Sequence, residues 1–189
     1  MTGKLKIFIS HYRKNFIFAK VLRDLLNTYG YTCWLPSDTI RRKTESVDRC
    51  DVMILLVDHN YILSKSCVYE AKLAAQLNKQ TIPILLEKMI WPTKELGENY
   101  AVANKFRIDL YGTMNIAFGA LDTDSQVYER YLCAFQNNEQ MKKVFAKLKL
   151  LSDDKKKIYL FRNCFKNNVS SYQSNILIIK KKLYRKINY

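Results

Sequence analysis

Apolar residues along the chain gather in five short runs that are typical of β-strands. The runs cover residues 6–10, 31–35, 52–57, 81–86 and 106–110. The third run, VMILLV, is six consecutive apolar residues bounded by Asp51 and Asp58. A strand without alternation of polar and apolar positions is covered on both faces, as in a parallel sheet. The pattern therefore predicts strands buried between two layers.

Helical spacing fills two of the segments between these strands. One apolar face marks a helix over residues 16–29: Phe16, Phe18, Val21, Leu22, Leu25 and Leu26. Gly30 follows, where a helix C-cap is expected. A second face marks a helix over residues 66–77: Cys67, Ala71, Ala74 and Ala75. Ser64 or Ser66 could cap the first turn of this second helix, after a short polar loop.

Two further segments show weaker or longer patterns. Residues 37–50 are mostly polar, and they hold too few apolar residues for more than about one or two helical turns. Residues 128–151 carry apolar side chains at helical spacing and are predicted to be helical. No fold is assigned to residues 152–189.

The order of these elements predicts an α/β fold, an open parallel flavodoxin-like sheet of about five strands followed by a helical, basic C-terminal extension. Sites in such sheets lie beyond the carboxyl ends of the strands. The segments 10–14, 37–43 and 58–70 each follow a strand. We therefore expect these three segments to converge at one edge of the sheet.

The net charge of +15 changes this picture less than its size suggests. Residues 1–139 hold 18 Lys and Arg against 15 Asp and Glu, whereas residues 140–189 hold 14 against 2. The excess charge therefore belongs to the C-terminal tail. Such a tail could bind nucleic acid or acidic lipid. The simpler interpretation, which we favour, is a solvated tail in a chain rich in Lys, Asn, Ile and Tyr.

Cysteine usage and the absence of several motifs narrow the class of protein. The five cysteines form no C-x-x-C pair and are odd in number, which favours free thiols in a reducing compartment. We expect no secretion signal, and no apolar stretch approaches the about 18 residues of a membrane span, so we predict a cytoplasmic protein. His11 and His59 have no third ligand nearby, so no metal site is predicted. The glycine motifs of NTPases, dehydrogenases and serine hydrolases are missing.

Five phrases in the right order resemble the Toll/interleukin-receptor (TIR) domain family over residues 6–112. They are KIFISHYRKN for the first strand and its loop, YGYTCWLPSD for the second strand and the BB loop, CDVMILLVDHNYILSKSCVYEAKLA for the third strand and following helix, IPILLEKMIWPTKELG for the fourth strand, and RIDL for the last. The resemblance implies a TIR-like domain over residues 1–122, extending to about 150 with a final helix. Residues 152–189 are then a basic tail.

Three departures from the family pattern bear on its use. The segment between Trp34 and Asp51 is shorter than usual by roughly two helical turns, and the Pro-Gly of the BB loop is absent. This departure concerns TIR–TIR assembly. Asp58 stands where a serine commonly closes the third strand, and Ser66 replaces the tryptophan before Cys67. Both of these concern the shape of the pocket.

The resemblance implies NAD as a substrate, with no cofactor. Many TIR domains cleave NAD, and the family's catalytic glutamate falls on Glu70 by the match Cys67-x-x-Glu70. Breaking the nicotinamide–ribose bond builds positive charge on the sugar, which a fixed carboxylate stabilises. Nicotinamide leaves as a neutral molecule, so the reaction requires no general acid. The alternative for Glu70 is structural, because the helix macrodipole favours a glutamate in the first turns.

Further roles are assigned to residues around the predicted edge of the sheet. Arg13 could meet the pyrophosphate, and Asp58 could bring a second carboxylate near Glu70. The aromatic candidates for stacking on a base or on nicotinamide are Tyr12, Trp34 and Tyr61. Trp34 also ends a strand, which suits a core residue better than a ligand. The candidates for contact with other TIR domains are Ser37, Asp38, Ile40, Arg41, Trp91 and Pro92.

Two functional hypotheses of different classes follow. The first is a cytoplasmic TIR signalling protein that hydrolyses or cyclises NAD through Glu70 when it self-associates. The second is a non-catalytic TIR adaptor in innate immune signalling, acting through homotypic contacts. Release of nicotinamide from NAD would separate the two.

Overall fold

The computed structural model describes residues 4–38, 43–96, 106–111 and 123–156. The chain divides into two compact units, and the larger one spans Lys4–Leu148. The fold and the site belong to this larger unit. No helix among the described residues is both long and apolar enough to cross a membrane.

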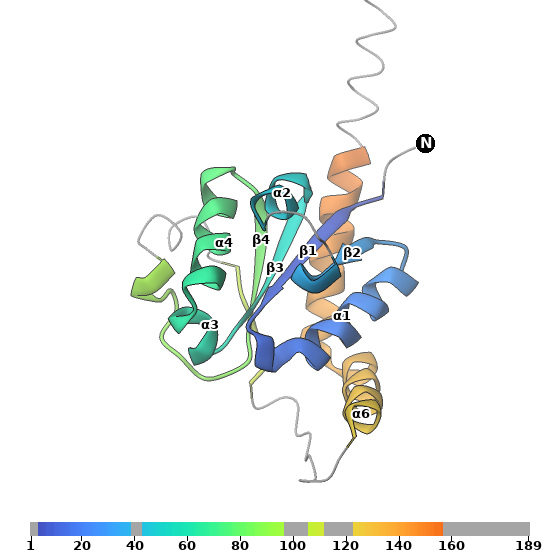
Figure 1. The fold of residues 1–189 in the computed structure, drawn as a ribbon. Helices are drawn as coiled ribbons and strands as arrows, with labels where there is room; N and C mark the ends of the chain where they lie inside the picture. The colour runs from blue at the N-terminus through green and yellow to red at the C-terminus, as the bar shows by residue number, and fades with distance from the viewer. Residues whose placement is uncertain (1–3, 39–42, 97–105, 112–122, 157–189) are drawn as a thin grey trace, which may run out of the picture. The chain divides into compact units, whose positions relative to one another are not determined.

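Strands and helices alternate along the larger unit (Figure 1). The strands are β1 (Lys6–His11), β2 (Thr32–Trp34), β3 (Val52–Val57), β4 (Gln80–Leu85) and β5 (Ile108–Asp109). The α-helices are α1 (Phe16–Thr28), α2 (Lys43–Arg49), α3 (His59–Leu63), α4 (Lys65–Gln76) and α6 (Asp124–Asn137), and a further helix begins at residue 139. Short 3-10 helices are η1 (Arg13–Asn15), η2 (Pro36–Asp38) and η3 (Lys94–Leu96). All five predicted strands are confirmed, although β5 is shorter than expected.

The five strands form one parallel sheet in the order β2-β1-β3-β4-β5. The predicted fold class is therefore confirmed. The chain passes from β1 outward to β2 and then crosses back to β3 on the other side of β1. Open α/β sheets bind ligands beyond the carboxyl ends of the strands that flank such a reversal of order, here β1 and β3.

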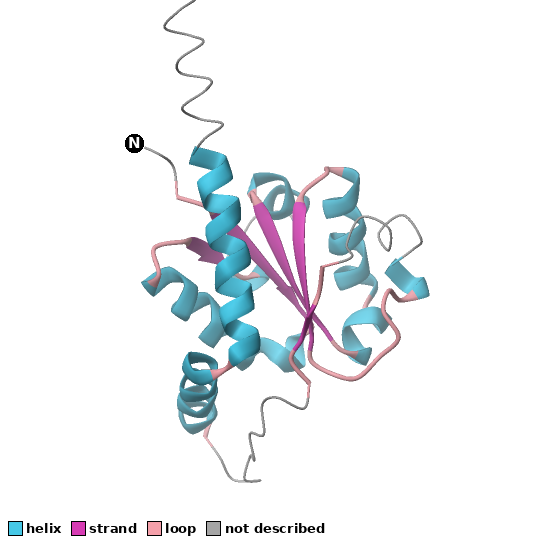
Figure 2. Cartoon of the chain, turned by 180° about the vertical axis from the view of Figure 1, so that it is seen from behind, coloured by secondary structure: helices cyan, strands magenta, loops and turns pink. Residues whose placement is uncertain are grey.

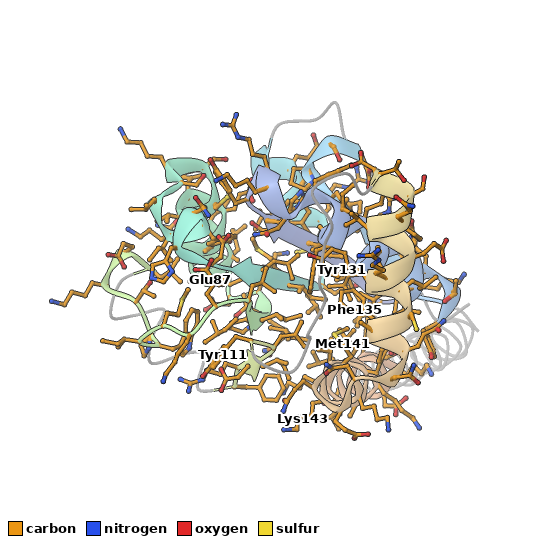
Figure 3. The ribbon with its side chains drawn as sticks, turned by 90° about the horizontal axis from the view of Figure 1, so that it is seen from below. Glu87, Tyr111, Tyr131, Phe135, Met141 and Lys143 are labelled. Atoms are coloured by element: carbon orange, nitrogen blue, oxygen red, sulfur yellow. The ribbon has the colours of Figure 1, made fainter. Side chains whose placement is uncertain are left out.

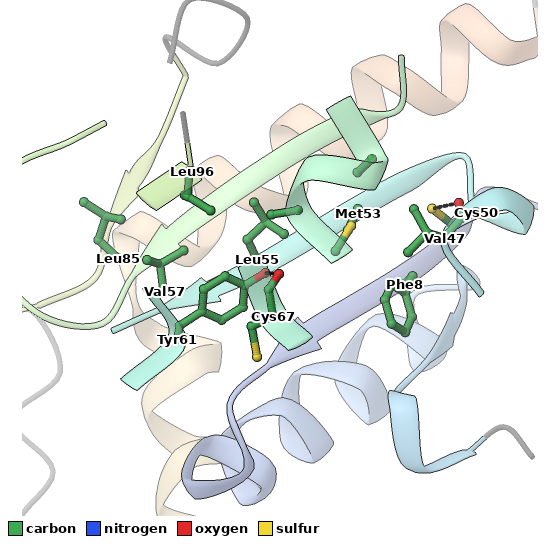
Figure 4. Close-up of a cluster of buried hydrophobic side chains, with 12 residues drawn as sticks. Phe8, Val47, Cys50, Met53, Leu55, Val57, Tyr61, Cys67, Leu85 and Leu96 are labelled. Atoms are coloured by element: carbon green, nitrogen blue, oxygen red, sulfur yellow. Dashed lines mark hydrogen bonds between the residues drawn. The ribbon is translucent and has the colours of Figure 1, made fainter. Parts of the chain in front are cut away.

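Both faces of the sheet are buried. Successive residues of a strand point to opposite faces, and consecutive residues of the central strands are all buried. Phe8, Met53 and Leu55 pack with residues of α2 and α4 in one hydrophobic cluster (Figure 4). Ile7 and Ile9, the neighbours of Phe8, are also fully buried. The unbroken apolar runs in the sequence therefore reflect strands that are covered on both faces, as predicted.

Helices beyond residue 122 contribute to the same core. The ring of Phe18 on α1 lies 4.7 Å from that of Phe135 and 5.1 Å from that of Tyr131, both on α6, in edge-to-face contacts. Tyr131, Phe135 and Met141 can be located in Figure 3, and Figure 2 shows α1 and α6 on the same side of the sheet. Phe135 and Met141 are fully buried or nearly so. The hydrophobic core therefore continues past the last strand.

Residues 128–151 are helical, as predicted, except at Asn138, which separates two helices. The chain leaves helical geometry at Asn138, where ψ is 123°, and a new helix begins at residue 139. The Asn138 side-chain oxygen accepts hydrogen bonds from the backbone N–H groups of Gln140 (2.8 Å) and Met141 (3.2 Å). Apolar periodicity continues across such a break, so the spacing alone did not reveal it. The capping asparagine was the available signal.

We expect replacement of Asn138 by alanine to lower the free energy of unfolding by about 1–2 kcal/mol, because two amide donors lose their acceptor. Urea denaturation followed by circular dichroism would measure the change. Asn137→Ala is the matched control, since its side chain is exposed and donates only to the carbonyl of Cys133. Equal losses from both variants would contradict the capping role.

The four described cysteines are free thiols, as predicted: Cys33, Cys50, Cys67 and Cys133. Burial raises the pKa of Cys33 and of Cys50 to about 12. These two thiols are therefore protonated and unreactive at neutral pH. Cys50 and Cys67 pack in the hydrophobic cluster as small apolar groups.

Candidate active site

A pocket of about 600 Å³ lies at the carboxyl edge of the sheet, beside the strand-order reversal. Three segments distant in sequence line it. They are His11, Tyr12, Arg13 and Phe16 from the end of β1 onward, Pro36 and Ser37 after β2, and Ser64, Ser66 and Cys67 at the junction of α3 and α4. The predicted convergence of three segments at one edge is therefore confirmed.

The segment after β1 supplies the charged side chain of the pocket. Arg13 opens η1, which leads directly into α1, and this short path holds Tyr12 and Arg13 at the end of β1. The Arg13 guanidinium lies 5.9 Å from the centre of the Tyr12 ring. Both residues line the pocket, where a cation and an aromatic ring could meet a phosphate and a base. Their substrate-binding roles stay predictions.

Glu70 is buried and is not among the residues that line the pocket. Ser64 caps α4, accepting a hydrogen bond from the N–H of Cys67 at 3.4 Å, and this fixes where the helix begins. Cys67, one turn before Glu70 on the same side of α4, lines the pocket, whereas Glu70 is only 2% exposed. The Ser10 hydroxyl donates to Glu70 Oε2 at 2.6 Å. The carboxylate is thus fixed between β1 and α4.

Asp58 holds a structural position. Its Oδ1 accepts from the N–H of Tyr61 at 2.6 Å, and its Oδ2 accepts from the side-chain amides of Asn15 (3.0 Å) and Asn60 (3.3 Å). Asp58 thereby caps α3, a helix in the segment that was expected to be a polar loop. Helix α3 has only five residues, which are too few to show a helical spacing of apolar positions in the sequence. Asp58 is not among the residues that line the pocket.

Two of the aromatic candidates, Tyr61 and Trp34, are not among the residues that line the pocket. Tyr61 is fully buried, so its ring offers no surface for stacking on a base (Figure 4). Its hydroxyl donates to the carbonyl of Cys67 at 3.2 Å. Trp34 packs against the hydrophobic cluster, with its ring 6.2 Å from that of Phe8. Tyr61 and Trp34 therefore contribute to packing in this structure. For Trp34, a packing role fits better than a ligand-binding role.

The residues predicted to contact other TIR domains have different environments. Ser37 is exposed and lines the pocket, whereas Asp38 accepts two hydrogen bonds from Arg23, at 2.8 and 2.9 Å, and one from the N–H of Leu35. Trp91 packs against the hydrophobic cluster and is followed by Pro92 in a cis peptide bond. Ile40 and Arg41 lie outside the described residues. The contacts of Asp38 and Trp91 are internal to the chain.

Ser10 is the residue that sequence reasoning did not single out. It is fully buried, on the same face of β1 as Phe8, and its hydroxyl contacts both Glu70 and Tyr61. A lone hydroxyl at the end of an apolar strand was the available signal. Such a group requires a buried hydrogen-bond partner.

His11, the last residue of β1, is a titratable residue that lines the pocket. Burial lowers the pKa of His11, partly opposed by the carbonyl of Ile9 and the carboxylate of Asp38. The ring is therefore neutral at neutral pH. Among the described residues, no group of His, Cys, Asp or Glu side chains is placed to hold a metal ion.

The lowered pKa of His11 predicts a pH dependence of stability. Below about pH 6.5 the unfolded chain protonates His11 while the folded chain does not, so the unfolded state binds more protons and folding weakens as pH falls. We expect His11→Gln to reduce the loss of unfolding free energy between about pH 7 and about pH 5.5. Urea denaturation at several pH values would measure this, and an identical loss in both proteins would contradict it.

Comparison with known proteins identifies the class that this fold and pocket belong to. A family model described as TIR domain matches residues 7–121. The chain therefore belongs to the TIR domain family.

The solved structures include a similar one, a CMP N-glycosidase from Clostridium botulinum, BcmB, at 17% sequence identity. The match covers 66% of this chain and 96% of that one, with a TM-score of 0.39. Similarity at this level does not carry a functional argument. Comparison with the curated proteins gives no match.

Proposed function

We propose that this chain is a TIR-domain signalling protein that cleaves the nicotinamide–ribose bond of NAD upon self-association, with Glu70 as the catalytic carboxylate. The observation that carries the proposal is the position of Glu70. It follows Cys67 by three residues, as in the family motif, and Cys67 lines a pocket at the carboxyl edge of the sheet.

The chemistry of the bond requires little more than a fixed negative charge and a way to orient the substrate. Positive charge develops on the ribose as nicotinamide leaves, and a carboxylate in a water-poor site stabilises that charge more than one in bulk water. Arg13 would pair with the pyrophosphate, and Tyr12 would stack on a ring of the substrate. The pocket volume of about 600 Å³ is ordinary for a small-molecule site.

Self-association is part of the proposal because Glu70 is almost fully buried in the single chain. The carboxylate can meet the ribose only if side chains at the pocket wall, such as Cys67, move aside. Contact with a second copy at the pocket mouth could supply that rearrangement. The short α2 leaves the segment before Asp51 reduced, so this contact would differ from the usual BB-loop contact.

A non-catalytic TIR scaffold is the second candidate. The burial of Glu70 favours it, since a carboxylate with 2% exposure can be purely structural. Leu63 and Ile90 are 77% and 89% exposed and offer apolar surface for contact with another chain. In this reading the protein acts in innate immune signalling by homotypic binding alone. We propose a cytoplasmic location in either case, in keeping with the free cysteines.

Nicotinamide release tests the proposal. The purified protein is incubated with NAD at increasing protein concentration, with light scattering to record assembly and chromatography to quantify nicotinamide. We expect release that rises more steeply than protein concentration. Assembly without any release would overturn the enzymatic proposal in favour of the scaffold. ADP-ribose and its cyclic isomer, separated in the same run, distinguish hydrolysis from cyclisation.

A further inference from the structure

Three buried oxygen-bearing side chains form a chain of hydrogen bonds that ends at the carboxylate of Glu70. The Ser10 hydroxyl lies 2.6 Å from Glu70 Oε2 and 2.9 Å from the hydroxyl of Tyr61. Ser10 and Tyr61 are fully buried, and Glu70 is 2% exposed. The three groups come from β1, α3 and α4, and they meet because these elements pack together.

Counting protons fixes the direction of the chain. Each hydroxyl has one proton to donate, and an ionised carboxylate can only accept. Ser10 therefore donates to Glu70, and Tyr61 must donate for its contact with Ser10 to be a hydrogen bond. The Tyr61 proton is shared with the carbonyl of Cys67, 3.2 Å away. Tyr61 thus orients Ser10, and Ser10 orients the carboxylate.

Both hydroxyls are unusual choices for their positions. Ser10 lies on the same face of β1 as Phe8, within a strand whose other interior positions are apolar. A buried hydroxyl is costly unless it is hydrogen-bonded, and a buried carboxylate is more costly still. A fully apolar core would avoid both costs. The arrangement is therefore best explained by a requirement to hold a charged group in one orientation.

We propose that Ser10 and Tyr61 are positioning residues that hold the Glu70 carboxylate in one orientation between β1 and α4. This inference rests on the proposed function, which makes Glu70 the catalytic group. Neither hydroxyl touches the substrate. They act through Glu70, because Ser10 donates to its Oε2 and Tyr61 contacts Ser10.

Activity measurements test the positioning role in the full chain. We expect Ser10→Ala to lower kcat for nicotinamide release by about ten- to a hundredfold, the effect of losing a hydrogen bond to a charged group, with KM changed by less than about threefold. Tyr61→Phe, which keeps the ring in the core, should have a smaller effect in the same direction. Ser10→Thr, which retains a hydroxyl, should recover part of kcat. Ser46→Ala is the matched control, because Ser46 is also a buried serine but lies on α2. It should leave kcat and KM unchanged.

A second measurement does not depend on activity. In protein labelled with ¹³C at the glutamate carboxyl carbon, the Glu70 signal is assigned by its loss in Glu70→Gln. We expect its titration midpoint to move to higher pH by about one unit in Ser10→Ala and by less in Tyr61→Phe, because a donor to the charged form is lost. Ser46→Ala should leave the midpoint in place. Thermal melting identifies any variant that fails to fold.

The two measurements separate the possible failures. If the wild type releases nicotinamide but Ser10→Ala and Tyr61→Phe keep both kcat and the Glu70 midpoint, the positioning role is overturned and the proposed function stands. If the wild type releases none, the proposed function fails, and the titration alone decides whether the two hydroxyls hold the carboxylate. Unmoved midpoints in that case would overturn this inference as well.

Discussion

Replacing Glu70 by glutamine should reduce nicotinamide release from NAD by at least about a hundredfold. Glutamine matches glutamate in size and can still contact the Ser10 hydroxyl, but it provides no negative charge for the developing positive charge on the ribose. The loss should appear in kcat, because the charge develops only in the transition state. Release of nicotinamide under conditions in which the wild type is assembled would measure it.

Glu139→Gln is the matched control, because Glu139 is exposed at the start of the last described helix and pairs only with the nearby Lys142. Its activity should equal that of the wild type. A second check is light scattering, which should show equal assembly in Glu70→Gln. Activity of Glu70→Gln within a few-fold of the wild type would exclude Glu70 as the catalytic group while leaving the fold assignment intact.

Replacing Phe135 by alanine should lower the free energy of unfolding by about 3–5 kcal/mol, the usual cost of emptying a buried aromatic position. Phe135 is 1% exposed, and its ring contacts that of Phe18 on α1. The family match ends at residue 121, before α6 begins. A large loss would show that the folding unit extends beyond the matched region.

Tyr69→Ala on α4 serves as the control for this measurement, because Tyr69 is an aromatic residue that is 51% exposed. Tyr69→Ala should lower the free energy of unfolding by less than about 1 kcal/mol, as expected for an exposed position. Urea denaturation followed by tryptophan fluorescence suits both variants. Similar small losses for Phe135→Ala and Tyr69→Ala would mean that α6 is not part of the cooperative core.

Local patterns in the sequence were sufficient to locate most elements of the domain. The run Val52–Val57 matches β3 at both ends, and the helix expected over residues 66–77 matches α4 to within one residue. Patterns failed where an element is short or where a cap interrupts a continuing period. Helix α3 has five residues, and Asn138 divides the segment predicted to be helical into two helices.

The site could be predicted only in part, because the orientation of a side chain depends on neighbours that are distant in sequence. Tyr12 and Arg13 line the pocket, as expected for residues directly after a strand. Tyr61 and Trp34 looked equally suitable, but Tyr61 is buried in the core and Trp34 is half-buried against it. An aromatic residue near the end of a strand or in a short helix suits both environments, and its own segment does not decide between them.

The sequence by itself determined the parallel α/β class, the edge of the sheet at which the pocket forms, and Glu70 as the carboxylate to test. Apolar runs, helical spacing and the family motif are properties of short segments, which is why they can be read directly. Only the tertiary structure buried the Glu70 side chain and brought Ser10, 60 residues earlier in the chain, within 2.6 Å of it. That contact exists because β1 and α4 pack together, and packing between distant segments leaves no local pattern.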